Sequence, residues 1–89
     1  MTGTFGGALE ARHIPAGEGH LSSHTIGEIE TDDGVLVVRR IHVTYRLRLE
    51  RERRSAAERA HAVHHDACPV YRTIKQCVAI TTSLEMDDL

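Results

Sequence analysis

A cysteine followed directly by a proline is the feature of this sequence with the clearest chemical meaning. Cys68 and Pro69 lie between a helical pattern and a further apolar run. Proline is favoured at the first position of a helix, because its missing N–H would have no partner there. Cys68 would then be the N-cap, near unpaired amides that favour the reactive thiolate. The alternative is a buried structural cysteine, since a free cysteine packs like a small apolar residue.

Two further residues bear on the chemistry of Cys68. Arg72 lies one helical turn further along the chain and would add positive charge near the sulfur. Cys77 is nine residues away, which corresponds to about 12–13 Å along a helix. A disulfide needs Cα atoms within about 7 Å. We therefore predict no Cys68–Cys77 bridge in the folded chain, and we expect Cys77 to be a core residue.

Three histidines precede this cysteine, namely His61, His64 and His65. Two of them can share a helix face with Cys68, as positions 61, 65 and 68 or positions 61, 64 and 68. Two histidines and a cysteine can ligate zinc and leave one position open. No carboxylate stands at the right offset, however, and the helix break comes before Cys68. An ordinary polar helix face is therefore favoured over a metal site.

The length and composition of the chain limit the classes of function. A chain of 89 residues forms at most one domain, and its core is small enough that a partner chain is expected. The net charge of −2 and the scarcity of aromatic residues argue against nucleic-acid binding. No apolar run approaches a membrane span, and the start does not have a signal-peptide pattern. These features predict a cytoplasmic protein with free thiols.

The first half of the chain predicts one helix and a hairpin. Residues 2–13 favour a helix that three glycines weaken. Residues 20–31 alternate weakly, as an edge strand does, and a turn follows at residues 32–34. Residues 35–49 alternate between apolar and polar over their whole length, with Arg39 as the one charged residue on the apolar face.

The second half predicts two helices and a last strand. Ser55 and Glu58 form a capping-box pattern, and the helix would run to about Ala67. Its apolar stripe consists of Ala56, Ala60, Val63 and Ala67. A short helix follows Pro69, and residues 78–86 alternate as a strand does. This order predicts an α+β fold, with a small antiparallel sheet of three strands covered by helices on one face.

Three segments of the sequence together resemble a known family. The segments VLVVRRIHVTYRL, CPVYRTI and VAITTSLE, with a His- and Ala-rich helix between the first two, resemble the C-terminal half of the OsmC/Ohr family. These are the osmotically inducible protein C and organic hydroperoxide resistance proteins. The resemblance covers residues 5–86, and the Cys-Pro segment is its most specific part.

The resemblance implies a fold and an assembly. Residues 1–89 would form a single partial OsmC-like domain, with the N-terminal part of the fold missing. Its parts would be a remnant of the central helix at 1–13, a hairpin at 20–49, helices with the Cys-Pro motif at 55–76 and a final strand at 78–86. Members of the family are intertwined homodimers, with active sites at the dimer interface.

The resemblance also implies a chemistry. Family members are thiol-dependent peroxidases that reduce organic hydroperoxides in the defence against oxidative stress. A peroxidatic cysteine lies on the central helix, and a resolving cysteine at the Cys-Pro motif closes a disulfide with it. A dithiol then reduces this disulfide, and no bound cofactor is implied. Cys68 matches the resolving cysteine, with Pro69 and Arg72 as supporting residues.

The sequence departs from this pattern because no residue of the chain matches the peroxidatic cysteine. The active site is therefore expected to be incomplete, and enzymatic activity stays open. The partner would be a second copy or a chain that supplies the missing half. Two alternatives remain, namely a non-catalytic OsmC-fold module for dimerisation or partner binding, and the small His/Cys metal site.

Overall fold

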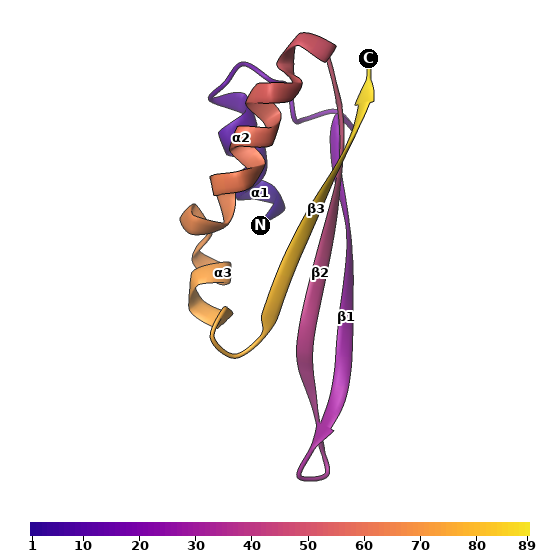
Figure 1. The fold of residues 1–89 in the computed structure, drawn as a ribbon, viewed down its shortest axis with the longest axis vertical. Helices are drawn as coiled ribbons and strands as arrows, with labels where there is room; N and C mark the ends of the chain where they lie inside the picture. Colours follow the sequence, from indigo (N-terminus) through magenta and orange to yellow (C-terminus); the bar gives the residue numbers. More distant parts are fainter.

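A three-stranded sheet and the helices that cover part of one face make up the computed structural model, which describes residues 1–89 (Figure 1). The elements are α1 (Thr2–Glu10), β1 (Leu21–Asp32), β2 (Val35–Leu49), the 3₁₀ turn η1 (Arg51–Arg53), α2 (Arg54–His64), the 3₁₀ turn η2 (His65–Ala67), α3 (Pro69–Ile74) and β3 (Ala79–Asp88). The predicted order of helices and strands is confirmed. No helix is long and apolar enough to cross a membrane.

The sheet is mixed rather than antiparallel. Its order is β1-β2-β3, and β1 pairs with β2 in antiparallel fashion. β3 pairs with β2 in parallel, from Ala79 opposite Arg40 to Asp88 opposite Leu49. The prediction of a fully antiparallel sheet is therefore wrong in this pair. A parallel pair of strands requires a crossover connection. Here the crossover consists of α2, η2 and α3, and it returns the chain toward the hairpin end of β2.

A β-bulge interrupts the pairing of β1 and β2. Pairing passes from Glu28 opposite Arg40 to Ile29 opposite Val38, which leaves Arg39 as an extra residue in β2. An extra residue of this kind bends the strand and shifts the alternation of its side chains by one. The charged residue that broke the predicted apolar face is therefore the residue at the bulge.

The bulge changes which side chains share a face. Arg39 and Arg40 both approach the carboxylate of Glu30, so both point away from the helices. Alternation then places Val35 and Val37 on this same outer face. The prediction that these two valines share a face with the core residues of β2 is therefore wrong.

The core lies between the inner face of β2 and the helices. Its members are Phe5, Leu9, Ile14, Val43, Tyr45, Leu47, Leu49, Ala57 and Ala60. The small side chains Ala57 and Ala60 of α2 belong to this core. The capping box is wrong, because α2 begins at Arg54 and no side chain caps it. The stripe is confirmed for Ala60 and wrong for Val63, since α2 buries Ala57, Ala60 and His64 and leaves Val63 51% exposed.

The hairpin of β1 and β2 projects beyond the helices and β3 (Figure 1). Ile29, Leu36 and Val38 lie on this projecting part, and 62%, 73% and 44% of their surfaces are exposed. The bulge places these three on the same side of the hairpin as the helices. The projecting hairpin therefore carries an apolar strip that nothing in the chain covers.

Candidate thiol site around Cys68

Cys68 connects η2 to α3. Its backbone is extended, with φ −87° and ψ 116°, as expected before a proline. Pro69 is the first residue of α3, so the predicted N-cap position of Cys68 is confirmed. The thiol itself is only 2% exposed. Cys68 is therefore both the residue before the helix and a buried residue, which combines the two interpretations made from the sequence.

Several polar groups surround the Cys68 sulfur. Burial raises the pKa of the thiol, but the backbone N–H of Tyr71 and the amino group of Met1 favour the thiolate, and so does the hydroxyl of Thr4. The net result is a pKa below the usual value. Thr4 and Met1 belong to the first turn of α1, so this turn lies over the sulfur. The site thus favours the reactive form of the thiol while covering it.

A buried pair of polar side chains lies next to this thiol. The hydroxyl of Tyr45 on β2 lies 2.9 Å from Nε2 of His64 on α2. Nδ1 of His64 lies 2.6 Å from the carbonyl oxygen of His61, so Nδ1 donates there and Nε2 accepts from Tyr45. Burial raises the pKa of Tyr45 to about 12, with a contribution from the Cys68 thiolate. Burial also lowers the pKa of His64, so its imidazole is neutral.

Two further rings, those of Phe5 and His61, lie against this pair. The ring of Phe5 lies 4.7 Å from Tyr45 and 5.0 Å from His64, measured between ring centroids. His61 stacks on His64 at 5.3 Å and hydrogen-bonds Thr82 of β3 through Nε2. We call Phe5, Tyr45, His61 and His64 the aromatic clamp. It connects α1, α2 and β2 beside Cys68.

The sequence did not predict the clamp, although one signal for it exists. Tyr45 stands on the inward face of the strongest strand, and a buried tyrosine hydroxyl needs a hydrogen-bond partner. Thr4 gave no signal, because its position over the sulfur depends on how α1 packs.

The residues of the alternative metal site do not converge. His61 and His64 direct their ring nitrogens to Thr82, to Tyr45 and to a backbone carbonyl. His65 packs its ring against Tyr71 at 5.1 Å. No group of three or more His, Cys, Asp or Glu side chains comes together in an arrangement that could hold a metal ion.

The structure also places the remaining predicted site residues. The guanidinium of Arg72 approaches the backbone carbonyl of Asp66, at 3.4 Å, and is not among the groups that lower the pKa of Cys68. Cys77 is exposed, so its prediction as a core residue is wrong. Both cysteines are free thiols. Cys77 follows α3 in the turn that leads to β3, where the chain leaves the helical layer.

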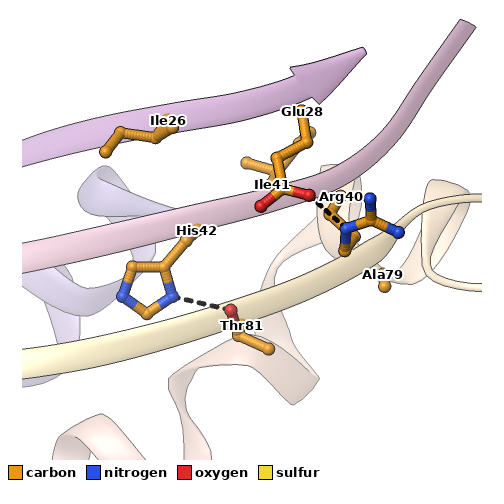
Figure 2. A pocket seen from close by; sticks show the side chains of 7 residues that line it. All are labelled: Ile26, Glu28, Arg40, Ile41, His42, Ala79 and Thr81. Atoms are coloured by element: carbon orange, nitrogen blue, oxygen red, sulfur yellow. Dashed lines mark hydrogen bonds and ion pairs between the residues drawn. The ribbon is translucent and has the colours of Figure 1, made fainter. Parts of the chain in front are cut away.

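A groove of about 250 Å³ lies on the outer face of the sheet (Figure 2). In it, Arg40 pairs with Glu28, and Nδ1 of His42 lies 2.6 Å from the hydroxyl of Thr81. The other ring nitrogen of His42 lies 3.1 Å from the hydroxyl of Ser83. The polar groups in the groove thus hydrogen-bond one another.

Comparison with known proteins gives matches to solved structures. No family model and no curated protein matches the chain. A hypothetical protein from Aquifex aeolicus VF5 superposes with a TM-score of 0.77 at 15% identity, over 99% of this chain and 65% of that one. An OsmC-like protein from Mycoplasma pneumoniae superposes with a TM-score of 0.68 at 15% identity, over 98% and 61%. This chain has the OsmC-like fold.

A third match is the organic hydroperoxide resistance protein OhrB of Bacillus subtilis. It superposes with a TM-score of 0.53 at 24% identity, over 94% of this chain and 62% of that one. The resemblance seen in the sequence is thus confirmed for the fold. In each of the three comparisons this chain spans less than two thirds of the solved chain's length. Activity, substrates and partners therefore need separate evidence.

Proposed function

We propose that this chain takes part in the thiol-dependent reduction of organic hydroperoxides, with Cys68 as the resolving thiol. The observation that supports this most is the place of Cys68, before Pro69 in an OsmC-like fold, with a pKa below the usual value. A protein that shares the fold is named for resistance to organic hydroperoxides. A reducing compartment such as the cytoplasm would keep both cysteines of the chain as free thiols.

The proposed chemistry has three steps. A peroxidatic thiolate attacks the O–O bond of the hydroperoxide, becomes a sulfenic acid and releases an alcohol. The Cys68 thiolate then attacks that sulfenic sulfur, which forms a disulfide and releases water after protonation. A dithiol reductant opens the disulfide by exchange and leaves as its own disulfide. Cys77 lies beyond the far end of α3, so we propose that the peroxidatic thiol lies outside residues 1–89.

The resolving step can be tested on the Cys77→Ser variant, which keeps Cys68 as the one thiol. A stable aryl sulfenic acid should form a mixed disulfide at Cys68 and release water, and dihydrolipoamide should reverse the adduct. Mass spectrometry detects both steps, and a chain that carries both Cys68→Ser and Cys77→Ser is the blank. A folded chain whose Cys68 stays unmodified would contradict the resolving role.

Turnover decides whether the chain is an enzyme by itself. The assay measures loss of cumene hydroperoxide with dihydrolipoamide, for the unchanged chain and for each cysteine variant. Turnover that Cys68→Ser abolishes and Cys77→Ser retains would mean that Cys68 also attacks the peroxide. Without turnover, a positive sulfenic acid test would leave Cys68 as a resolving thiol only.

A second candidate function is a non-catalytic module that binds a second copy of the chain. The apolar strip of Ile29, Leu36 and Val38 on the projecting hairpin favours it, because exposed apolar patches of this kind mark interaction sites. Sedimentation of the unchanged chain should show a dimer, and Leu36→Lys should shift it to a monomer. Thr31→Lys offers a matched change on the same side of the same hairpin, and it should weaken the dimer less.

A further inference from the structure

The Cys68 thiol is buried under the first turn of α1, yet any reaction requires access to its sulfur. Two buried side chains anchor α1, and Met1, Ala8 and a hydrogen bond from Thr2 to Ser23 add to its contacts. Phe5 and Leu9 are the two that it buries, and glycine occupies three of its nine positions. Because glycine weakens a helix by about 1 kcal/mol relative to alanine, α1 depends on packing against the rest of the chain.

The aromatic clamp supplies much of that packing. Phe5 is the one clamp residue on α1, and its ring contacts Tyr45 on β2 and both histidines on α2. Thr4, whose hydroxyl favours the Cys68 thiolate, is the residue before Phe5. A change that loosens Phe5 therefore also moves the cover of Cys68.

We propose that the aromatic clamp is an acid-sensitive gate, in which protonation of His64 releases α1 and exposes the Cys68 thiol. His64 is 1% exposed, and both of its ring nitrogens are already used, Nδ1 as a donor and Nε2 as an acceptor. A proton on Nε2 would remove the acceptor that the Tyr45 hydroxyl uses. It would also place a positive charge on a side chain that is buried away from water.

No carboxylate is among the groups that shift the pKa of His64, and Cys68 is the neighbouring group that can carry a negative charge. The titratable and charged groups around it are His61 on α2, His65 on η2, Tyr45 on β2 and the amino group of Met1 at α1. The Cys68 thiolate acts on Tyr45 and is not among the groups that shift the pKa of His64. Protonation of His61, which also acts on His64, would add repulsion and favour opening further.

The direction of the pH dependence follows from linkage. The folded environment lowers the pKa of His64, whereas an exposed imidazole in the open form has a pKa of about 6.5. The open form therefore binds the proton more tightly, and acid below that value favours it. The open population should rise by up to about tenfold per pH unit for each histidine that takes up a proton. This inference concerns access to the thiol and holds whether or not Cys68 reduces hydroperoxides.

Competition between the two thiols of the chain tests the gate. Dipyridyl disulfide, which stays reactive in acid, labels both thiols. Mass spectrometry measures the ratio of the initial labelling of Cys68 to that of exposed Cys77, which serves as the internal reference. Between about pH 7.5 and about pH 5.5 the ratio should rise by about tenfold for one histidine. His64→Gln, which keeps an acceptor and a donor, should flatten the rise, and exposed His24→Gln should leave it unchanged.

Hydrogen exchange of the unchanged chain supplies a second readout that needs no variant. After correction for intrinsic rates, amides of α1 should lose protection at about pH 5.5 while those at the centre of β2 keep theirs. A labelling ratio that is equal at both pH values would overturn the gate. So would a rise that persists in His64→Gln or disappears in His24→Gln, or an α1 whose protection does not change.

Discussion

Replacing Tyr45 by phenylalanine removes one hydroxyl group and keeps the ring. The hydroxyl is buried and donates to Nε2 of His64 at 2.9 Å. His64 cannot turn to find another partner, because its Nδ1 already donates to the carbonyl of His61. Tyr45→Phe therefore leaves a buried ring nitrogen without a donor.

The expected cost follows from two contributions. Loss of the hydrogen bond and desolvation of the unpaired nitrogen together cost about 1–3 kcal/mol. The ring contact with Phe5 at 4.7 Å stays, so no cavity adds to the loss. For a domain of this size, each 1 kcal/mol lowers Tm by about 4–8 °C. We expect Tyr45→Phe to lower the free energy of unfolding by about 1–3 kcal/mol.

Urea unfolding followed by far-UV circular dichroism measures the change, since the chain has no tryptophan. Tyr71→Phe is the matched control, because Tyr71 is only partly buried and packs its ring against His65. This control should change the free energy of unfolding by less than about 0.5 kcal/mol. Equal losses in the two variants would refute the argument that the Tyr45–His64 bond stabilises the fold.

The same variant should change stability in alkali. Burial and the nearby Cys68 thiolate raise the pKa of Tyr45 to about 12, while an exposed tyrosine has a pKa of about 10. The folded state thus holds this proton more tightly, and its stabilising effect is complete below about pH 10. Stability should then fall between about pH 10 and 12. In Tyr45→Phe this part of the fall should be absent, and a curve that keeps it would assign the titration to another group.

Three further predictions concern the strand, the helix and the surface. Deletion of Arg39 removes the extra residue of the bulge and leaves every other side chain of β2 on its present face, so thermal unfolding should stay cooperative. Deletion of Thr44, in contrast, moves the side chains of one half of β2 to the opposite face and should abolish folding. Ala60→Leu overpacks the contact of α2 and should cost about 1–3 kcal/mol in urea unfolding, while Ala62→Leu on the exposed side should not. Arg40→Gln removes exposed ion pairs with Glu28 and Glu30, so any loss in Tm should disappear at high salt.

The sequence predicts the strands best where one face meets the core. In β2, Val43, Tyr45, Leu47 and Leu49 are buried at every second position, as their alternation indicates. The strand bounds are also close to those predicted. The signal is strong here because a shift by one residue would expose the whole apolar set to water.

The same reasoning fails beyond the core. Val35 and Val37 continue the alternation of β2 in the sequence, but the bulge at Arg39 moves them to the opposite face. Nothing penalises this change, because no helix covers the hairpin there. The sequence also could not predict that β3 runs parallel to β2, because alternation shows which residues share a face and not the relative direction of neighbouring strands. That direction depends on the path of the crossover helices.

The sequence predicts the position of Cys68 at the start of a helix, but it does not predict which side chains surround the thiol. Cys68 as the residue before Pro69 follows from the local preferences of proline. Its cover by Thr4 depends on contact between residues more than sixty positions apart, for which the sequence has no periodic signal. Cys77 was placed in the core by its apolar character, whereas the turn before β3 carries it to the surface.

The face that α2 turns toward the core explains why the thiol site and the proposed gate occur together. By hydrophobicity alone, α2 should bury Val63, which is 51% exposed, in place of His64, which is 1% exposed. Burying the remaining half of a valine would gain only about 1 kcal/mol. It would also leave the Tyr45 hydroxyl unpaired in the core, which costs about 1–3 kcal/mol. The tyrosine on β2 therefore selects the helix face, and this choice makes the packing of α1 over Cys68 depend on a neutral imidazole.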